Sequence, residues 1–531
     1  MMSIQEQPPK NITFKFDDPD LAAGLLEKLD IYSVVPEEAI PSNNFTRLYS
    51  MYQGNDDYCD RHREYFVNNT EEFFTKIKLV SNYWPNHKLR TRIFPALGED
   101  ITIRKYRGKN KKNQDQYQHT YPYDSQIYVM WNLYYIDRQI GKQYSCLAQE
   151  SNHIPGHDLI YRKDNASQAL VRYAKKFESR PNCFNFNKYF PKTWVLTEKE
   201  QCKEFFEEFL SQRYQQLKQE RNIVYFRKIG ADVHEGKGVF PVNDLEGEYI
   251  KDLYKNGELC GKIKDNNLIQ YNVHNLLLVQ NRKFGFRSFM LIASVNPLIA
   301  YYHDGYARLS LDTYDSKSNN TSTFVTNIGV NLKHTDFSNW TNQQIQDYTY
   351  WPLEKFAKHL YDEGVVSDPE WLDNHLRKEF MKVKIHILRM AQEGFIKKSS
   401  VFELFGLDYV MDENLNLWFI EANSMPLIQG FTKHATELIN RMLMDQFEIV
   451  TGLLRSRMKR VVLYVNKLTS EFGGEVPNLM ERREEFKELI TNNFEVEFRP
   501  SKNNTFYRII DENYSGKERY SGLIEEECLV F

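Results

Sequence analysis

The sequence predicts a mixed α/β (α+β) fold, in which helices surround a mixed sheet. Stretches rich in β-branched and aromatic residues, such as 223–229 and 283–302, alternate with charged amphipathic stretches, such as 164–176 and 198–221. The first kind is typical of strands and the second of helices. Because hydrophobic residues make up 41% of the chain, a buried core is also expected. Interleaved strands and helices around one core favour this class.

The same patterns predict the individual elements beyond residue 125. Helices are expected at 164–176, 198–221, 352–361, 369–392 and 435–459, and strands at 223–229 and, as a pair, at 283–302 and 307–311. Residues 402–420 predict a hairpin, because two apolar runs flank Asp412, Glu413 and Asn414, which favour a turn.

Charge and hydropathy exclude several classes of protein. Lys and Arg number 69 and Asp and Glu 72, so the net charge of −3 argues against a dedicated nucleic-acid-binding protein. The longest apolar stretch, 288–302, is too short and too interrupted by Asn296 and Pro297 to span a membrane. The first twenty residues contain acids and no apolar run, which predicts neither a secretory signal nor a transit peptide.

The cysteines predict an intracellular protein with reduced thiols. They lie far apart with no C-x-x-C pair, which supports neither a zinc ribbon nor a disulfide framework. The Asn-x-Ser/Thr triplets are then expected to be incidental. The six cysteines are Cys59, Cys146, Cys183, Cys202, Cys260 and Cys528.

The predicted hairpin carries the most informative chemistry. If it turns at Asn414–Leu415, Asp408 lies opposite Glu421, and Asn423 lies on the same face two residues further along. Two carboxylates this close repel each other unless a proton or a cation lies between them. A small set of oxygen ligands suits Mg²⁺ that also binds a nucleotide's phosphates. A magnesium site and an ordinary solvent-facing hairpin edge are the two interpretations of this pattern.

A second element is a strand that ends in Lys228 and is followed by a loop containing Gly236 and Gly238. Glycine lets backbone amides approach a phosphate closely, and the lysine can neutralise its charge. Taken alone, the pattern fits a plain surface turn equally well.

A third element places Lys283, Gly285 and Arg287 on one face of a strand, with Arg308 following. Two arginines near a magnesium site can bind a carboxylate or a phosphate in bidentate fashion. The order of these elements along the chain therefore suggests chemistry of ATP and Mg²⁺ on a carboxylate.

With these motifs, the chain resembles the tubulin tyrosine ligase-like family from about residue 146 to residue 459. The first 125 residues and the last 70 or so are not covered. The motifs that carry the resemblance are QESNHIPGHDLIYRKD (149–164), FPKTWVL (190–196), FRKIGADVHEGKGV (226–239), LIQYNV (268–273), the stretch 283–311, TFVTN (323–327), and FELFGLDYV with LWFIEANSMP.

The resemblance implies an ATP-grasp-type fold and a role for each matching residue. Magnesium ligands are implied at Asp408, Glu421 and Asn423. Contacts with ATP are implied at Lys228, Gly236, Gly238, Gln270, Tyr271, Val273 and Lys283, with residues 270–273 in the hinge that holds adenine. Arg287 and Arg308 are implied to meet the γ-phosphate and the activated carboxylate, and Lys163 to lie near the acceptor. For His153 and Trp194 we prefer a packing role.

The chain departs from the family pattern at three positions. Gly285 stands where the family usually has Asp, Ile229 replaces a proline, and Phe324 replaces a histidine. The complete set of magnesium ligands favours an active enzyme, and a degenerate scaffold-type member is the alternative.

The resemblance implies an ATP- and Mg²⁺-dependent ligase that adds an amino acid to glutamate carboxylates of tubulin tails or of another protein. The stretch 296–315 looks most like the polyglycylase branch, which makes glycine the expected donor and glutamate the alternative. A microtubule-associated structural protein is the third hypothesis. Tubulin and a free amino acid are the implied partners, and the cytoplasm, the cytoskeleton and cilia the implied location.

Four regions are expected on this basis. Residues 1–125 form an N-terminal region of unknown role, 126–220 and 221–460 the ligase module, and 461–531 a C-terminal appendage. Two basic runs, at 104–112 and 455–460, are candidate landing sites for acidic tails. A solvated loop and favourable charge at a helix C-terminus are the respective alternatives.

Overall fold

The computed structural model describes residues 14–29, 56–81, 100–101, 107–109, 115–117, 126, 128–131, 146–221, 223–229, 238–258, 260, 267–315, 339–395, 397, 400–424, 426, 433–491 and 498–529. Gly236, Phe324 and most of the basic run 104–112, which the sequence singled out, lie outside these residues.

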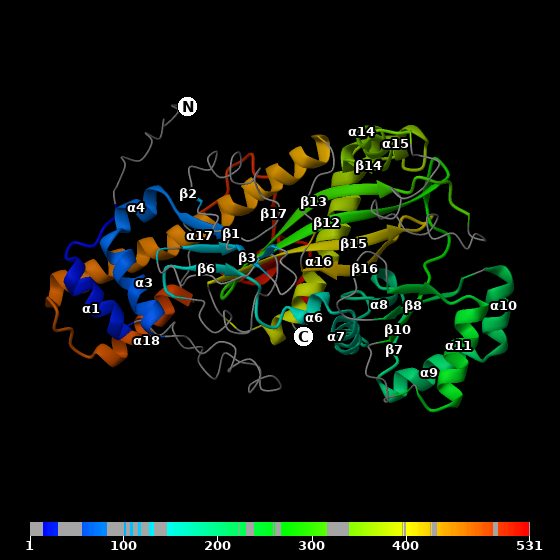
Figure 1. Ribbon diagram of the computed structural model, residues 1–531, viewed down its shortest axis with the longest axis horizontal. Coiled ribbons are helices and arrows are strands. Elements are labelled where there is room, and N and C mark those ends of the chain that lie inside the picture. Colours follow the sequence, from blue (N-terminus) through cyan, green and yellow to red (C-terminus); the bar gives the residue numbers. More distant parts are fainter. Residues whose placement is uncertain are drawn as a thin grey trace.

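Among the described residues, eleven strands form one mixed sheet through the middle of the molecule (Figure 1). Its centre is the long hairpin of β12 (Arg282–Val295) and β13 (Leu298–Leu309), and β15 (Val401–Met411) pairs with β12 on the other side. The remaining strands are β1 (Lys78–Ser81), β2 (Asp100–Ile101), β5 (Val129–Trp131), β6 (Glu150–Asn152), β11 (Leu278–Val279), β14 (Tyr350–Trp351), β16 (Leu417–Asn423) and β17 (Tyr507–Asp511). A separate two-stranded pair joins β3 (Arg107–Lys109) and β4 (Asp115–Tyr117).

Helices cover both faces of this sheet, which explains why β12 reads as an almost continuous apolar run. Phe286 and Met290 pack into the core with α16 (Arg377–Ala391), whereas Phe289 and Leu291 point to the opposite face and pack with α17 (Lys433–Phe472). The other helices are α1 (Pro19–Leu29), α3 (Asp56–Asn68), α4 (Thr70–Thr75), α6 (Asp158–Tyr161), α7 (Lys163–Lys175), α8 (Phe186–Tyr189), α14 (Asn342–Thr349), α15 (Leu353–Asp362) and α18 (Leu479–Thr491), with a π-helical turn at Leu372–Leu376.

A smaller lobe is built on a second, antiparallel sheet in the order β7 (Thr193–Val195), β10 (Asn267–Tyr271), β8 (Tyr225–Ile229) and β9 (Val239–Pro241). One face of this sheet packs on α9 (Lys199–Phe209), α10 (Gln212–Glu220) and α11 (Asp244–Lys255) around Trp194, which confirms its packing role. The two sheets lie beside each other with α7 and α8 near their junction (Figure 1). The α/β class predicted from the sequence is confirmed.

Two predicted elements differ in detail. The single helix expected at 198–221 is two helices, because the Ser211 hydroxyl accepts a hydrogen bond from the Tyr214 amide and starts α10 afresh. The predicted strand 283–302 is interrupted at Asn296–Pro297, which forms the turn between β12 and β13. Pro297 has no N–H to donate to a strand ladder, so a strand boundary there is favourable.

The predicted division at residue 460 differs from the structure. α17 runs without a break from Lys433 to Phe472, so the basic residues 455–460 lie in mid-helix rather than at a helix C-terminus. Arg457 is buried there and forms an ion pair with Glu150 of β6. Beyond α17, β17 pairs with β13, and α18 lies near α1. The described residues of 461–529 therefore pack with the main sheet and its core and do not form a separate appendage.

The expectation of reduced thiols is wrong, because the cysteines are joined in pairs. Disulfide bonds link Cys59 to Cys146, Cys183 to Cys528, and Cys202 to Cys260. Their separations of 87, 345 and 58 residues leave no local signature in the sequence.

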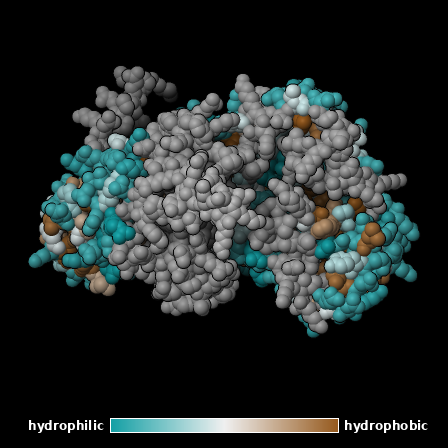
Figure 2. All heavy atoms as spheres, viewed as in Figure 1, coloured by the Kyte–Doolittle hydropathy of each residue, from teal (hydrophilic) through white to brown (hydrophobic). Residues whose placement is uncertain are grey.

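No described helix is both long enough and apolar enough to cross a membrane. On the face drawn in Figure 2, hydrophobic residues are interspersed among hydrophilic ones over the small lobe. The exposed apolar side chains of that lobe include Leu210, Leu245 and Tyr249.

Candidate functional site

The hairpin of β15 and β16 brings the three predicted oxygen ligands together. Asp408 lies directly opposite Glu421, and Asn423 lies opposite Gly406. A β-bulge between Asp408 and Tyr409 shifts the register by one residue, and this shift sets Asp408 against Glu421. The register predicted from the sequence is confirmed. The three side chains are half-buried and lie at one end of the hairpin.

Two arginines converge on Asp408 from the neighbouring strands. Arg287 of β12 donates from Nε to Asp408 Oδ1 at 2.5 Å and from Nη2 to Oδ2 at 2.7 Å, and Arg308 of β13 donates from Nη2 to Oδ1 at 2.9 Å. Burial alone would raise the pKa of Asp408, but the two guanidinium groups outweigh it and hold that pKa below its usual range. Asp408 is therefore an ionised carboxylate whose two oxygens are both engaged.

Two lysines lie on the Glu421 side of the site. Lys163 at the start of α7 approaches Glu421, with Nζ at 3.4 Å from Oε2. Burial lowers the pKa of Lys228 to about 8, and the carboxylates of Glu421 and Asp408 oppose this effect. At neutral pH, four basic side chains thus face two carboxylates.

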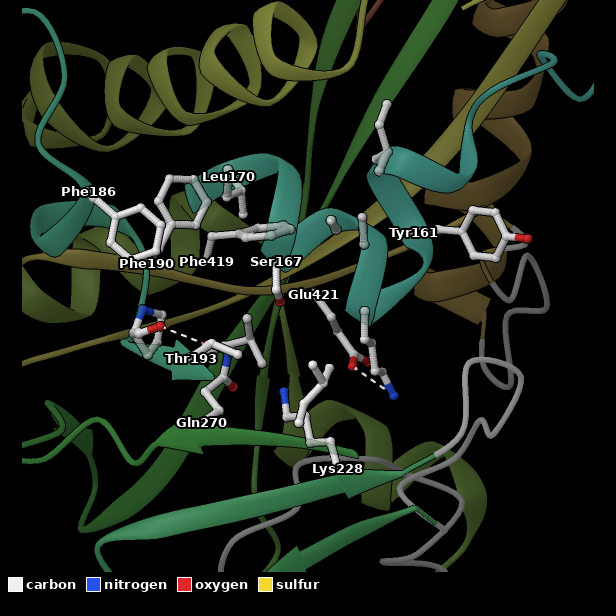
Figure 3. A pocket seen from close by; sticks show the side chains of 17 residues that line it. Tyr161, Ser167, Leu170, Phe186, Phe190, Thr193, Lys228, Gln270, Phe419 and Glu421 are labelled. Atoms are coloured by element: carbon white, nitrogen blue, oxygen red, sulfur yellow. Dashed lines mark hydrogen bonds and ion pairs between the residues drawn. The ribbon is translucent and has the colours of Figure 1, made fainter. Parts of the chain in front are cut away.

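A pocket lies between the small lobe and the main sheet (Figure 3). Lys228 and Gln270 project into it from β8 and β10, while Ser167 of α7 and Glu421 of β16 line the other side. Gln270 donates a hydrogen bond to the Thr193 hydroxyl, which fixes its amide on the pocket wall. Aromatic and aliphatic side chains complete the lining, namely Leu170, Phe186, Phe190, Leu268 and Phe419. An apolar wall with a few polar groups is typical of a site for a planar heterocycle with a charged tail.

The structure gathers most of the predicted site residues but not all of them. Tyr271 points to the other face of its strand, where its ring packs beside Tyr225 and its hydroxyl accepts a hydrogen bond from Arg221. Val273 follows the strand and does not line the pocket. Burial lowers the pKa of Lys283 to about 8, and Gly238 is buried at the start of β9.

Sequence reasoning missed several residues that shape the site. Thr193 and Ser167 line the pocket. The FPKTWVL motif could have indicated Thr193, whereas Ser167 lies three residues beyond the nearest quoted motif and has no signal of its own. Gly406 leaves room for the side chain of Arg287, since a Cβ atom there would lie 3.1 Å from Nη1 of that arginine. Gly305 has a φ of +68° and lies against the carbonyl oxygen of Arg287, so a side chain there would clash.

Behind the site, a buried carboxylate ties α6 to β15. Oε1 of Glu403 lies 3.1 Å from Nδ1 of His153, and Oε2 lies 2.7 Å from Nδ1 of His157. Oε2 also accepts a hydrogen bond from the backbone amide of Ile154. Burial would raise the pKa of Glu403, but the two histidines lower it to about 2. This network supports the preferred packing role of His153, because His153, His157 and Glu403 are all buried.

The donor atoms fit a hard divalent cation that is bound together with a polyanion. Asp408, Glu421 and Asn423 offer carboxylate and amide oxygens, which Mg²⁺ prefers. The four surrounding cations leave an excess of positive charge, and Nε of Arg308 is buried without a hydrogen-bond partner among the described residues. A nucleotide's phosphates would satisfy both features. A cation at Asp408 would compete with Arg287 and Arg308 for its oxygens, each of which can accept more than one contact.

Comparison with known proteins gives the family of the chain. The model of the Tubulin-tyrosine ligase family matches residues 139–459. Human "Inactive polyglycylase TTLL10" is 27% identical over 197 residues, which cover 36% of this chain and 28% of the relative. Rat "Protein polyglycylase TTLL10" is 24% identical over 318 residues, which cover 56% of this chain and 44% of the relative. Mouse "Tubulin polyglutamylase TTLL5" is 24% identical over 312 residues, which cover 57% of this chain and 21% of the relative.

The chain spans less than half the length of the polyglycylase relatives named here. The family match, by contrast, covers more than half of this chain and contains the hairpin, both arginines and the pocket. The chain belongs to the tubulin-tyrosine ligase family.

Proposed function

We propose that the chain is an ATP- and Mg²⁺-dependent carboxylate–amine ligase. It adds an amino acid, with glycine as the first candidate, to glutamate side-chain carboxylates of tubulin tails or of another protein. The observation that carries this proposal is the convergence of Arg287, Arg308, Lys163 and Lys228 on the carboxylates of Asp408 and Glu421 beside an apolar pocket.

The pocket residues account for nucleotide binding. Gln270 and Thr193 offer polar groups at the wall against which adenine would lie, and Phe190 and Phe419 offer apolar surface. Lys228 would neutralise phosphate charge at the inner end. Mg²⁺ at Asp408, Glu421 and Asn423 would supply further neutralisation of the phosphates.

The arginines account for activation of the acceptor. A bare carboxylate is a poor acyl donor, so it must first take a phosphoryl group from ATP to become an acylphosphate. Arg287 and Arg308 can hold the acceptor carboxylate and the γ-phosphate together, which lowers the entropic and electrostatic barrier. The amine of the amino acid then displaces phosphate and leaves an amide bond. Lys163, at the pocket mouth beside Glu421, is placed to steer the acidic acceptor.

Two further candidates each have an observation in their favour. A glutamate ligase is supported by the polyglutamylase relatives, which match over a similar share of the chain. A non-catalytic microtubule-associated protein is supported by Gly285 and by the bidentate contact of Arg287 with Asp408. Tubulin-modifying relatives point to association with the cytoskeleton, and we propose the cytoplasm and cilia as the location on this basis.

The test is an incorporation assay with the purified full chain. Microtubules and a glutamate-rich acceptor peptide are incubated with ATP, Mg²⁺ and labelled glycine, glutamate or tyrosine in separate reactions. Incorporation of one amino acid identifies reaction and donor together. Microtubule binding without incorporation of any donor would contradict the proposal in favour of the structural role.

A further inference from the structure

The complete pairing of the cysteines calls for an explanation that the ligase reaction does not give. Three disulfide bonds join residues that are 87, 345 and 58 positions apart. Every one of the six cysteines is used, and all but Cys260 are buried. Cysteines that served merely as small core residues would have no reason to meet in pairs across such distances.

Each bond fastens a different part of the molecule. Cys59–Cys146 joins α3 to the segment before β6, and Cys183–Cys528 joins the segment after α7 to the last described turn of the chain. Cys202–Cys260 joins α9 to the segment after α11 within the small lobe. Such bonds persist where the environment is oxidising and are rare where thiols are kept reduced.

A second, independent feature points the same way. Asn-x-Ser/Thr triplets begin at Asn68, Asn339 and Asn503, and all three asparagines are exposed at the surface. Such triplets accept N-linked oligosaccharides in the lumen of the secretory pathway. Asn165 and Asn513 begin further triplets but are less exposed, and Asn165 lies on α7 close to the pocket.

We propose that the working protein carries these three disulfide bonds and N-linked glycans at Asn68, Asn339 and Asn503, and that it acts in an oxidising compartment. The proposal keeps the ligase reaction proposed above, on which its last step rests, and replaces the cytoplasmic and ciliary location with an oxidising compartment. The acceptor would then be a glutamate-bearing protein of that compartment rather than a cytosolic tubulin tail. The name of the rat polyglycylase gives its acceptor only as protein, whereas the name of the mouse polyglutamylase gives tubulin. An acceptor other than tubulin is therefore compatible with the comparisons.

Both modifications need a co-reactant of known class. Each disulfide forms by exchange with a protein disulfide carrier, in which two thiols lose two protons and two electrons and the carrier's disulfide becomes a dithiol. Each glycan forms when Nδ2 of asparagine bonds to the anomeric carbon of a lipid-linked oligosaccharide, with release of the amide proton and the lipid diphosphate.

The experiment uses the full chain isolated from its own cells, with thiols trapped by acid quenching and N-ethylmaleimide. We expect no maleimide adducts before reduction, six after reduction, and linked peptides for the three pairs. Release of N-glycans should convert the three exposed asparagines to aspartate, while Asn165 and Asn513 stay unmodified and serve as internal controls. Six adducts before reduction would overturn the proposal. Paired cysteines with unmodified asparagines would overturn the glycan sites and keep the disulfides.

The incorporation assay is run on the same preparation and scored separately. Ligation by protein with free thiols would uphold the proposed function and contradict this inference. Paired cysteines with no ligation to any acceptor would uphold this inference and contradict the proposed function.

Discussion

Arg287 binds both carboxylate oxygens of Asp408, the central member of the predicted magnesium site. The two contacts, of 2.5 and 2.7 Å, form a bidentate pair that neutralises the charge of Asp408. Gly285, two residues before Arg287, lies opposite Arg308 in the sheet, at a position where the family resemblance leads us to expect an acid. The two arginines therefore have Asp408 as their shared partner, and the predictions below test what this arrangement does.

Replacement Glu421→Gln removes one carboxylate from the site and keeps its shape. Because transition-state charge can no longer be balanced through the cation, we expect turnover to fall by about 10²–10³ or more. The unfolding midpoint should stay within a few degrees, since Glu421 is only half-buried. The turnover rate and the thermal unfolding midpoint are measured for the wild type and the variant in parallel. Glu413→Gln, at the exposed tip of the same hairpin, is the matched control, and an unchanged rate for Glu421→Gln would refute the metal assignment.

Replacement Gly285→Asp restores an acid opposite Arg308. The new carboxylate should compete with Asp408 for Arg308 and thereby make Asp408 more available to a cation. We expect Mg²⁺-dependent ATP affinity to rise by about tenfold, which corresponds to about 1.4 kcal/mol. Isothermal titration with ATP at several Mg²⁺ concentrations measures the effect. Gly285→Asn, which adds similar bulk without charge, is the control, and an equal gain in both variants would rule out this electrostatic explanation.

The buried Glu403 should make stability depend on acid pH. Its pKa is lowered to about 2 in the folded chain, against an ordinary value of about 4.5, so the unfolded chain binds the proton more readily. The stabilisation is therefore present above pH 4.5 and is lost as the pH falls towards 2. At about 1.4 kcal/mol per pH unit, the full loss amounts to about 3 kcal/mol.

Denaturant unfolding of the wild type and of Glu403→Gln at pH 7 and pH 3 measures this effect. The stability advantage of the wild type should shrink at pH 3, because the amide cannot titrate. Glu413→Gln is again the exposed control. An advantage that is the same at both pH values would show that the histidines do not stabilise the ionised carboxylate.

Loss of the Cys202–Cys260 bond should destabilise the small lobe. A bond that closes a loop of this length typically contributes about 2–4 kcal/mol. We expect the double variant Cys202→Ser, Cys260→Ser to lose ATP binding on warming well before the wild type does. The double variant Cys59→Ser, Cys146→Ser is the matched control, because its bond lies outside the small lobe and should affect unfolding more than ATP binding. Wild-type behaviour of the first variant would show that the bond does not stabilise the lobe.

The sequence predicted those features that depend on local pattern. Turn residues at 412–414 were sufficient to place Asp408 opposite Glu421, although the β-bulge that completes this register has no signal of its own. The apolar and aromatic run likewise indicated a strand at 283–302, but its burial on both faces was not predicted and depends on the helices that cover the sheet.

Features that depend on contacts between distant segments could not be predicted in this way. Nothing near Cys183 indicates that it meets Cys528, and nothing in the charged residues after 460 indicates that β17 joins the main sheet. Tyr271 shows that a family motif alone does not predict where a side chain points. It matches a family position for adenine, yet strand alternation turns its side chain away from the pocket that Gln270 lines.

The most direct test of the central claim is Mg²⁺-dependent ATP binding by the full chain, measured by titration calorimetry with and without Mg²⁺. If Asp408, Glu421 and Asn423 hold the cation that binds the phosphates, affinity should fall at least tenfold without Mg²⁺, and Asp408→Asn should show the weak affinity under both conditions. Equal ATP affinity with and without Mg²⁺ in the wild type, or no ATP binding at all, would contradict the account.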